Sequence, residues 1–282
     1  MSGVFLVTDS SSDLIEDDIE PFDLEIVPLS IRFGADEFTD RKELSVTAFY
    51  ERMAAEDELP QTACPSPGAF EEAFERAERA GADAVVCLTI SGALSNTIQS
   101  AHTAAATFEG RLPVHVVDSR SVSSGLGTLV LSAARRAREG ADVDAVVELV
   151  HRLVGRTHVL AALNTLENLK RGGRIGGAKA MVASLLSIKP LIDITGGVVE
   201  EAGRARTRAK VLQLLAERLL GAGEIEQVAV MHGEATDLEQ FLGLIAARFP
   251  RTAVRVGELG AVIGSHGGAQ VIGVSWIEAE SA

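Results

Sequence analysis

Ala84-Val85-Val86-Cys87-Leu88-Thr89-Ile90 is an almost continuous apolar run. A strand with one buried face alternates apolar and polar residues, so an unbroken run predicts a strand that is covered on both faces, as in parallel sheets. The residues that follow are mostly small or polar, and the apolar spacing over residues 98–108 indicates a helix. The run therefore predicts one strand–loop–helix unit of an α/β fold.

The same unit recurs on either side of this run. Residues 4–8 are apolar and lead into a polar loop, and residues 114–118 are followed by a serine-rich loop and a helix over 125–138. Residues 26–33 are expected to form one further strand, at a sheet edge because Pro28 cannot donate a backbone hydrogen bond. Alternating strands and helices predict right-handed crossovers, with helices on both faces of a mainly parallel sheet.

The pattern changes near Arg156. Thr195-Gly196-Gly197 lies between two strand-like segments and predicts a hairpin. We therefore expect two α/β domains: residues 1–155, with a mainly parallel sheet and flanking helices, and residues 156–282, with a mixed α/β sheet. The elements expected in the second domain are strands over 157–163, 188–194, 198–202, 227–233, 252–259 and 271–276 and helices over 166–170, 178–186, 205–220 and 239–249.

Composition and charge exclude several classes of function. The chain has 282 residues, a formal net charge of −14, 46% hydrophobic residues and only 4% aromatic residues. A strongly acidic chain repels phosphate backbones and anionic lipid surfaces, so nucleic-acid binding is not expected and membrane contact is expected to be transient at most. The 2 cysteines are too few for a disulfide framework or a zinc site. No Walker or dinucleotide motif is found, so no cofactor is expected.

The N-terminal segment and the longest apolar stretch argue against export and membrane insertion. Residues 1–7 lack a basic region and run directly into a strand, unlike a signal peptide. The stretch 180–194 is interrupted by Ser184, Lys189 and Asp193, so no membrane span is expected. These features predict a soluble cytoplasmic protein.

A proline-rich connector occupies residues 60–70, which contain three of the 8 prolines of the chain. Each proline restricts its own φ and the conformation of the preceding residue, so the connector holds the side chains of Thr62, Cys64 and Ser66 in place. Ser66 followed by Pro67 predicts the N-cap and first turn of a helix. By itself, the segment fits a rigid loop before a helix as well as it fits a binding loop.

Two later loops carry groups suited to binding an anion. Ser91-Gly92-Ala93-Leu94-Ser95-Asn96-Thr97 links the buried strand to a helix, so its backbone N–H groups and hydroxyls can converge on one ligand. A capped helix start explains the same residues. Near the C-terminus, glycines on both sides of His266 predict a loop over residues 260–268 that presents the imidazole to a ligand, although a lone histidine is more often structural.

Basic residues gather at the start of the helix expected over 205–220. Arg204, Arg206 and Arg208 oppose the helix dipole at this end. The cluster therefore favours an acidic or anionic partner, although a solvated charged face is the commoner outcome of such a pattern.

Taken together, these motifs make the chain resemble the DegV family of bacterial fatty-acid-binding proteins over nearly its whole length. Each motif alone is modest, but their order and spacing are specific. The resemblance rests on residues 7–14, 62–68, 91–101, 118–119, 169–175, 188–190, 204–210 and 262–266.

The resemblance implies that a long-chain fatty acid lies in a buried tunnel between the two domains. Its carboxylate would be held by Thr62, Ser95 and His266. Groups of the loop after the buried strand would assist, at Ser91, Gly92 and Asn96.

The resemblance also implies a partner. Family members of this type present the carboxylate to a fatty-acid kinase, which is similar to dihydroxyacetone kinases and phosphorylates the acid to an acyl phosphate. The chain would then be a lipid carrier in phospholipid metabolism and not an enzyme. Its expected contact with the kinase is the basic cluster of Arg204, Arg206 and Arg208.

Four places depart from the pattern of the family. Ala63 stands where serine is usual, Gly92 where a second serine is common, and Asn96 where glycine is common. After His266 the family prefers a Thr-Gly-Pro-Gly type of run, and this chain has Gly267-Gly268-Ala269-Gln270. The three headgroup candidates are retained, so fatty-acid binding remains the expectation.

Two other functions remain open. A hydrolase or phosphotransferase could use Ser95 or Cys64 with His266, but no acidic residue is placed in the sequence to orient His266, and no Gly-x-Ser-x-Gly elbow surrounds Ser95. A small-molecule sensor would need a DNA-binding module, which the acidic charge disfavours.

Overall fold

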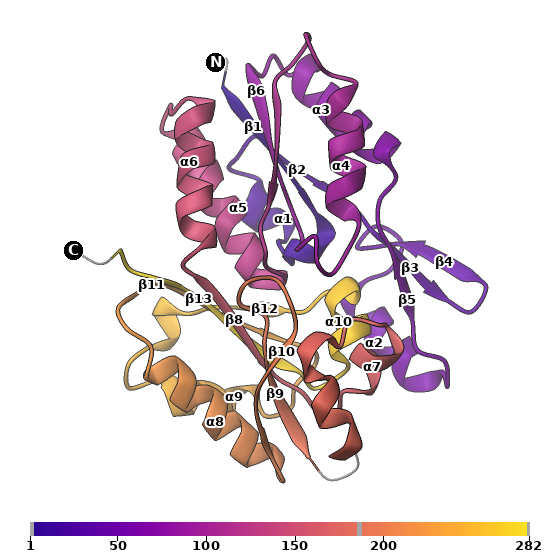
Figure 1. The fold of residues 1–282 in the computed structure, drawn as a ribbon, viewed down its shortest axis with the longest axis vertical. Coiled ribbons are helices and arrows are strands. Elements are labelled where there is room, and N and C mark those ends of the chain that lie inside the picture. The colour runs from indigo at the N-terminus through magenta and orange to yellow at the C-terminus, as the bar shows by residue number, and fades with distance from the viewer. Residues whose placement is uncertain (1–2, 185–187, 281–282) are drawn as a thin grey trace.

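The computed structural model describes residues 3–184 and 188–280 and arranges them around three β-sheets (Figure 1). In Figure 1 a four-stranded sheet lies in the upper half, a six-stranded sheet lies in the lower half, and a small three-stranded sheet lies beside their junction. The six-stranded sheet begins at Thr157. The predicted domain boundary between residues 155 and 156 stays a prediction.

The four-stranded sheet is parallel throughout, as predicted. Its order is β2 (Leu24–Val27), β1 (Val4–Asp9), β6 (Ala84–Thr89) and β7 (Val114–Asp118). Helices α3 (Pro67–Arg79) and α4 (Thr97–Ala106) cover one face, and α5 (Ser123–Arg138) and α6 (Val143–Val154) cover the other. Val85 and Cys87 pack against α3 and α4, whereas Val86 and Leu88 pack against α5 and α6. Because both faces of β6 are covered, its residues do not alternate between apolar and polar.

The prediction of one strand over residues 26–33 is wrong. Strand β2 ends at Val27, and the chain turns away at Pro28. The Leu29 N–H donates to the Ser10 hydroxyl (3.1 Å) and does not continue the parallel sheet. A separate strand, β3 (Ser30–Phe33), pairs antiparallel with β4 (Asp36–Thr39) and with β5 (Gln61–Ala63) to form the small sheet.

The remaining elements of the first half are short. They are η1 (Ser10–Ser12), α1 (Glu16–Ile19) and α2 (Val46–Ala55). The N-cap predicted at Ser66 is confirmed, because its hydroxyl accepts from the Ala69 N–H at 3.2 Å and Pro67 begins α3.

The six-stranded sheet is mixed, as predicted. Its order is β10 (Glu200–Ala205), β9 (Lys189–Asp193), β8 (Thr157–Ala162), β13 (Ile272–Glu278), β11 (Ile225–His232) and β12 (Arg255–Glu258), and only β11 and β12 are parallel neighbours. The predicted hairpin is confirmed, since β9 and β10 pair antiparallel. Helices α8 (Arg208–Leu220) and α9 (Leu238–Ile245) cover one face of the sheet, while Val159, Ala161 and Ile192 on the other face belong to the core that contains α5.

Residues 260–268 form helix α10 (Ala261–Gly267) and not the loop predicted around His266. Glycine disfavours a helix by about 1 kcal/mol relative to alanine, but here it permits close packing. A Cβ on Gly264 would lie 2.7 Å from the Tyr50 hydroxyl and 2.8 Å from a ring carbon of Phe49. Tertiary packing of α10 against α2 therefore overrides the propensity of this segment.

Two other helix predictions need correction. β10 extends through Arg204 to Ala205, so α8 begins three residues later than predicted, at Arg208. The helix predicted over 178–186 is a 3₁₀ segment, η2 (Gly176–Ser184), and residues 185 and 186 lie outside the described residues. Two short elements complete this half: α7 (Glu167–Arg171) and η3 (Arg251–Ala253).

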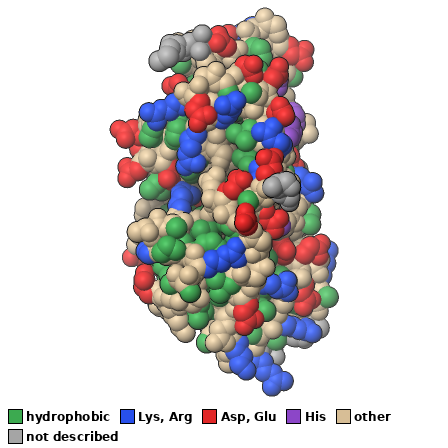
Figure 2. Space-filling view, turned by 90° about the vertical axis from the view of Figure 1, so that its left-hand side faces the viewer, with side chains coloured by type: hydrophobic (Ala, Val, Ile, Leu, Met, Phe, Trp, Pro, Cys, Tyr) green, Lys and Arg blue, Asp and Glu red, His purple; other side chains and the backbone are tan. Residues whose placement is uncertain are grey.

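The surface carries charge of both signs. Figure 2 shows acidic and basic side chains over the whole face in view, with hydrophobic side chains gathered in the lower half of the molecule. Among residues 3–184 and 188–280, no helix is both long and apolar enough to cross a bilayer.

Candidate ligand-binding site

A cavity lies between the carboxyl ends of the parallel strands and the face of the six-stranded sheet that α8 and α9 do not cover. Together with the open space at its mouth, it spans about 860 Å³ between protein atoms. Most of its wall is aliphatic and comes from both halves of the chain, including Leu29, Ile90, Leu94, Val122, Val159, Ala161, Leu163, Ile192, Ile194, Val199, Met231, Leu259 and Val274.

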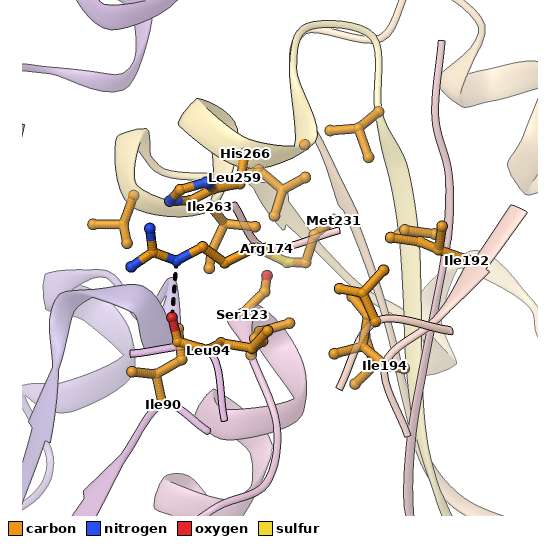
Figure 3. Close-up of a pocket in the computed structure, with 18 of the residues that line it drawn as sticks. Ile90, Leu94, Ser123, Arg174, Ile192, Ile194, Met231, Leu259, Ile263 and His266 are labelled. Atoms are coloured by element: carbon orange, nitrogen blue, oxygen red, sulfur yellow. Dashed lines mark hydrogen bonds between the residues drawn. The ribbon is translucent and has the colours of Figure 1, made fainter. Parts of the chain in front are cut away.

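Six polar side chains line this cavity. Two of them, Ser123 and Ser124, have hydrogen-bond partners in Asp13 and Ser275. We call the other four the polar end: Thr62, Ser95, Arg174 and His266. Figure 3 shows Arg174 and His266 on one side of the cavity, with Ile192 and Ile194 across from them. The predicted group of Thr62, Ser95 and His266 therefore lies on one cavity, although its members are far apart in the sequence.

Thr62 and His266 are in direct contact. The Thr62 Oγ1 atom lies 3.0 Å from the Nε2 atom of His266. Thr62 is held by β5, where it pairs with Ile31 of β3. Strand pairing thus determines where the hydroxyl points, and α10 brings the imidazole to it.

The neighbours of α10 determine where His266 lies. The Asn168 side-chain amide donates to the Ser265 carbonyl at 3.0 Å. A Cβ on Gly172 would overlap the Nδ1 atom of His266, so only glycine leaves room for the ring. At the other end of α10, the Gly260 N–H donates to the Asp13 carboxylate at 2.9 Å.

Asp13 also joins this helix to the first half of the chain. Its carboxylate accepts from Arg41 at 3.0 Å and from the Ser123 hydroxyl at 2.6 Å. Burial raises the pKa of Asp13, while the nearby charge of Arg41 acts in the opposite direction. Asp13 therefore links α10 to Arg41 and to the first turn of α5.

The imidazole of His266 is neutral at physiological pH. Burial and, to a lesser extent, the positive charge of Arg174 together lower the pKa of His266 to about 4. The Nδ1 atom is buried without a hydrogen-bond partner among the described residues. An unpaired buried N–H is costly, so the proton belongs on Nε2, which can then donate to Thr62 or to an anion in the cavity.

Arg174 is a site residue that the sequence analysis did not include. Its guanidinium donates to the Leu94 carbonyl at 3.0 Å and to the Gly172 carbonyl at 2.7 Å, and neither acceptor neutralises its charge (Figure 3). A cation fixed at the wall of an apolar cavity favours an anion there. The signal in the sequence was an arginine beside two glycines in the basic loop 171–177.

Ser95 keeps a donor for a ligand. Its hydroxyl lies 2.9 Å from the Thr97 hydroxyl and accepts from the Thr97 N–H at 3.3 Å. Since Thr97 can supply the proton of that contact, the Ser95 O–H can point into the cavity.

The rest of the predicted anion loop is occupied by its own contacts. The Ser91 hydroxyl donates to the Gly197 carbonyl at 2.6 Å, and the Gly92 N–H donates to Asp118 at 3.2 Å. Ser91, Gly92 and Asn96 are not among the described residues that line the cavity. The structure therefore places these three outside the cavity wall, and their contact with a ligand stays a prediction.

The geometry does not support the enzyme alternative. A catalytic triad needs an acceptor on the second ring nitrogen of the histidine, and Nδ1 of His266 has no partner among residues 3–184 and 188–280. Cys64 is exposed and is not part of the cavity wall. Within the same described ranges, no three histidine, cysteine, aspartate or glutamate side chains are grouped to hold a metal ion.

The three arginines of the basic cluster differ in their surroundings: one is held in an ion pair and two are exposed. The Arg208 guanidinium forms a two-bond ion pair with Asp237 at 2.8 and 3.1 Å and also donates to the Ala162 carbonyl. Arg204 and Arg206 are exposed, on β10 and just after it. The expectation that Arg208 is free to bind a partner is therefore corrected.

Comparison with known proteins gives consistent matches over the whole length. A family model described as "Uncharacterised protein, DegV family" matches residues 4–279. A DegV domain-containing protein of Deinococcus radiodurans is 36% identical over 284 residues, covering 96% of this chain and 97% of that protein.

Two solved structures are similar in both fold and sequence. One, described as "Fatty Acid Binding of a DegV family Protein from Thermus thermophilus", has a TM-score of 0.90 and 35% identity and covers 98% of this chain and 100% of that chain. A fatty acid binding DegV family protein of Streptococcus agalactiae has a TM-score of 0.89 and 26% identity, with 99% and 100% covered.

Proposed function

Because the chain belongs to the DegV family, we propose that it binds one long-chain fatty acid in the cavity between its two large sheets. The carboxylate lies at the polar end, and the acyl chain extends toward Ile192 and Ile194. The observation that carries this proposal is the distribution of chemistry along the cavity, which has an aliphatic wall and a cluster of donors that includes Arg174 and His266 across from those two isoleucines.

The aliphatic wall supplies most of the binding free energy. Burial contributes about 0.8 kcal/mol per methylene, so a tail of about fourteen methylenes contributes on the order of 11 kcal/mol before the costs of association. An aliphatic wall also suits an acyl chain better than a planar ring, which aromatic side chains would stack against.

The polar end offsets the cost of burying a carboxylate. An ionised carboxylate in an apolar cavity is strongly disfavoured unless it accepts hydrogen bonds. Thr62, Ser95 and His266 can each donate one, and Arg174 adds a positive charge close by. Because His266 is neutral, it acts as a donor and not as an ion-pair partner.

We expect protein purified from cells to contain long-chain fatty acid at nearly one molecule per chain. The reason is the burial of the tail, which makes dissociation into water slow. The test is mass spectrometry of the denatured protein after extraction with organic solvent, with quantification of acid against protein. Recovery of a nucleotide or a sugar phosphate in place of an acid would refute the proposal.

We further propose that the bound carboxylate is presented to a partner fatty-acid kinase that converts it to an acyl phosphate. A polar surface hollow shares Thr62, Arg174 and His266 with the cavity and adds Asn168 and Arg171. The carboxylate would therefore lie within reach of a reagent that approaches from outside, while the tail stays buried.

Charge reversal of the two exposed arginines, Arg204→Glu with Arg206→Glu, is expected to slow kinase-dependent acyl-phosphate formation by roughly ten-fold at low salt, because rim charges mainly affect association. Fatty-acid binding should not change. Arg208 is left intact because its bonds to Asp237 support the fold.

The matched control is Arg135→Glu with Arg136→Glu on α5, which changes net charge by the same amount at another exposed site. Both pairs are assayed with kinase, ATP and loaded carrier at two salt concentrations. If the control pair slows the reaction equally, docking at Arg204 and Arg206 is refuted.

A further inference from the structure

The turn between β9 and β10 is attached to two loops of the parallel sheet. The Ser91 hydroxyl donates to the Gly197 carbonyl at 2.6 Å, and the Arg120 guanidinium donates to the Gly196 carbonyl at 3.3 Å. Ser91 is only 1% exposed, so its bond is shielded from water. These two bonds join segments that belong to different sheets.

The fit of this turn depends on glycine. Gly197 has a φ of 89°, and a Cβ there would lie 2.5 Å from the Ser91 hydroxyl and 3.0 Å from the Cα atom of Arg120. Such close approach leaves no space for a side chain, so the position of the turn is narrowly determined.

The two loops that hold the turn are themselves joined. The Asp118 carboxylate accepts from the Gly92 N–H at 3.2 Å and from the Arg120 N–H at 2.8 Å. Ser91 and Arg120 are therefore presented from one stiff unit at the carboxyl ends of β6 and β7, and a displacement of one loop would move the other.

The same hairpin forms part of the apolar wall of the cavity. Ile192, Ile194 and Val199 lie on it or next to its turn and line the cavity. Figure 3 shows Ile192 and Ile194 across the cavity from Arg174 and His266. With a carboxylate at the polar end, the last methylenes of a long acyl chain would meet this wall.

We propose that Ser91 and Arg120, by holding the turn after β9, determine the longest acyl chain that the cavity accepts. The inference rests on the proposed fatty-acid binding and adds a pair of positioning residues that do not touch the carboxylate. Each methylene that is buried against an apolar wall strengthens binding by about four-fold. A methylene that can be buried only by displacing the wall loses that gain to strain. When both hydrogen bonds hold the turn, the hairpin wall can move little to admit a longer chain. When one of them is removed, the wall can move further.

The test compares the affinities of lauric, palmitic and arachidic acids for three variants. Two of them change residues that hold the turn, and one changes the turn itself. Ser91→Ala removes the donor, Gly197→Ala introduces the clash, and Arg120→Gln removes the second bond at the surface. In each variant we expect the affinity for arachidic acid relative to palmitic acid to rise by about fifteen-fold, which corresponds to two additional methylenes in contact with the wall at about four-fold each. Lauric acid, whose tail has four methylenes fewer than that of palmitic acid, should bind as it does to the native protein.

The matched control is Arg248→Gln, because the exposed Arg248 guanidinium also donates to turn carbonyls, those of Leu220 and Ala222, in a turn that does not line the cavity. An equal loss of affinity for all three acids would show that the contacts only support the fold. An unchanged ratio of the affinities for arachidic and palmitic acid would show that the position of the wall does not depend on these contacts. Either result overturns the proposal. If Ser91→Ala or Gly197→Ala does not fold, Arg120→Gln, at an exposed position, still decides the question. If the native protein binds none of the acids, the proposed function itself fails, which is distinct from binding with an unchanged preference.

Discussion

The double variant Thr62→Val with Ser95→Ala is expected to bind palmitic acid more weakly than the native protein by about 2–6 kcal/mol. Each change removes one hydroxyl that can donate to the carboxylate, and each lost hydrogen bond to a charged acceptor costs about 1–3 kcal/mol. Both side chains line the polar end of the cavity, and Thr62 also contacts Nε2 of His266.

The measurement that isolates this effect uses two ligands. Palmitic acid and its methyl ester bury the same tail, but the ester accepts weaker hydrogen bonds because it carries no charge. Affinity for the ester should therefore be nearly the same in the native and double-variant proteins. Isothermal titration calorimetry of the delipidated proteins with both ligands gives the change in affinity for the acid and the change in affinity for the ester.

The control removes two hydroxyls elsewhere. Ser100→Ala with Thr103→Val changes α4 on residues that do not line the cavity. This pair should leave both affinities unchanged. If Thr62→Val with Ser95→Ala weakens the acid and the ester equally, the two hydroxyls support the cavity and do not hold a carboxylate.

The second large effect is expected from Arg174→Gln, which removes the positive charge at the polar end. Affinity for palmitic acid should fall by about 1.5–3 kcal/mol, the usual worth of a hydrogen bond to a charged group. The neutral ester should lose much less. Arg174→Lys retains the charge without the two-bond geometry and should fall between the native protein and Arg174→Gln.

The same change has a consequence for His266. The charge of Arg174 helps to hold the pKa of His266 at about 4, and burial has the larger effect. Without that charge, protonation of the ring is less unfavourable, so the pKa should rise toward 6.5 without reaching it. An NMR titration of the His266 ring in the delipidated protein measures this shift.

Lys170→Gln is the control for this experiment. Lys170 lies on α7, four residues before Arg174, but it is exposed and lines neither the cavity nor the surface hollow. Its replacement should change neither the acid affinity nor the pKa of His266. A His266 pKa that stays at about 4 in Arg174→Gln would show that burial alone lowers it.

Several elements could be predicted because their cause is local. The continuous apolar run in β6 indicates a strand that is covered on both faces. Ser66 before Pro67 indicates the start of a helix, and neither pattern depends on distant residues. The turn at Gly196 and Gly197 likewise needs positive φ values, 85° and 89°, that glycine adopts without strain. Such patterns depend on neighbours within a few residues, so they can be read directly along the chain.

The errors arose where distant contacts overrule local preference. The glycines around His266 looked like a loop, but Gly264 allows α10 to pack against Phe49 and Tyr50. Arg208 looked like part of a free basic cluster, but Asp237, 29 residues away, binds it. Pro28 was assigned to an edge strand, whereas the chain there passes from one sheet to another.

The amino-acid sequence by itself determined the α/β class, the order of most strands and helices along the chain, and three of the four polar-end residues through family resemblance. Only the tertiary structure decided that Arg174 joins them on the cavity wall and that Ser91 holds the turn after β9. The physical reason is distance along the chain. Thr62 and His266 are 204 residues apart, and Ser91 and Gly197 are 106 residues apart. Contacts of that kind follow from how whole sheets pack, which no local pattern records.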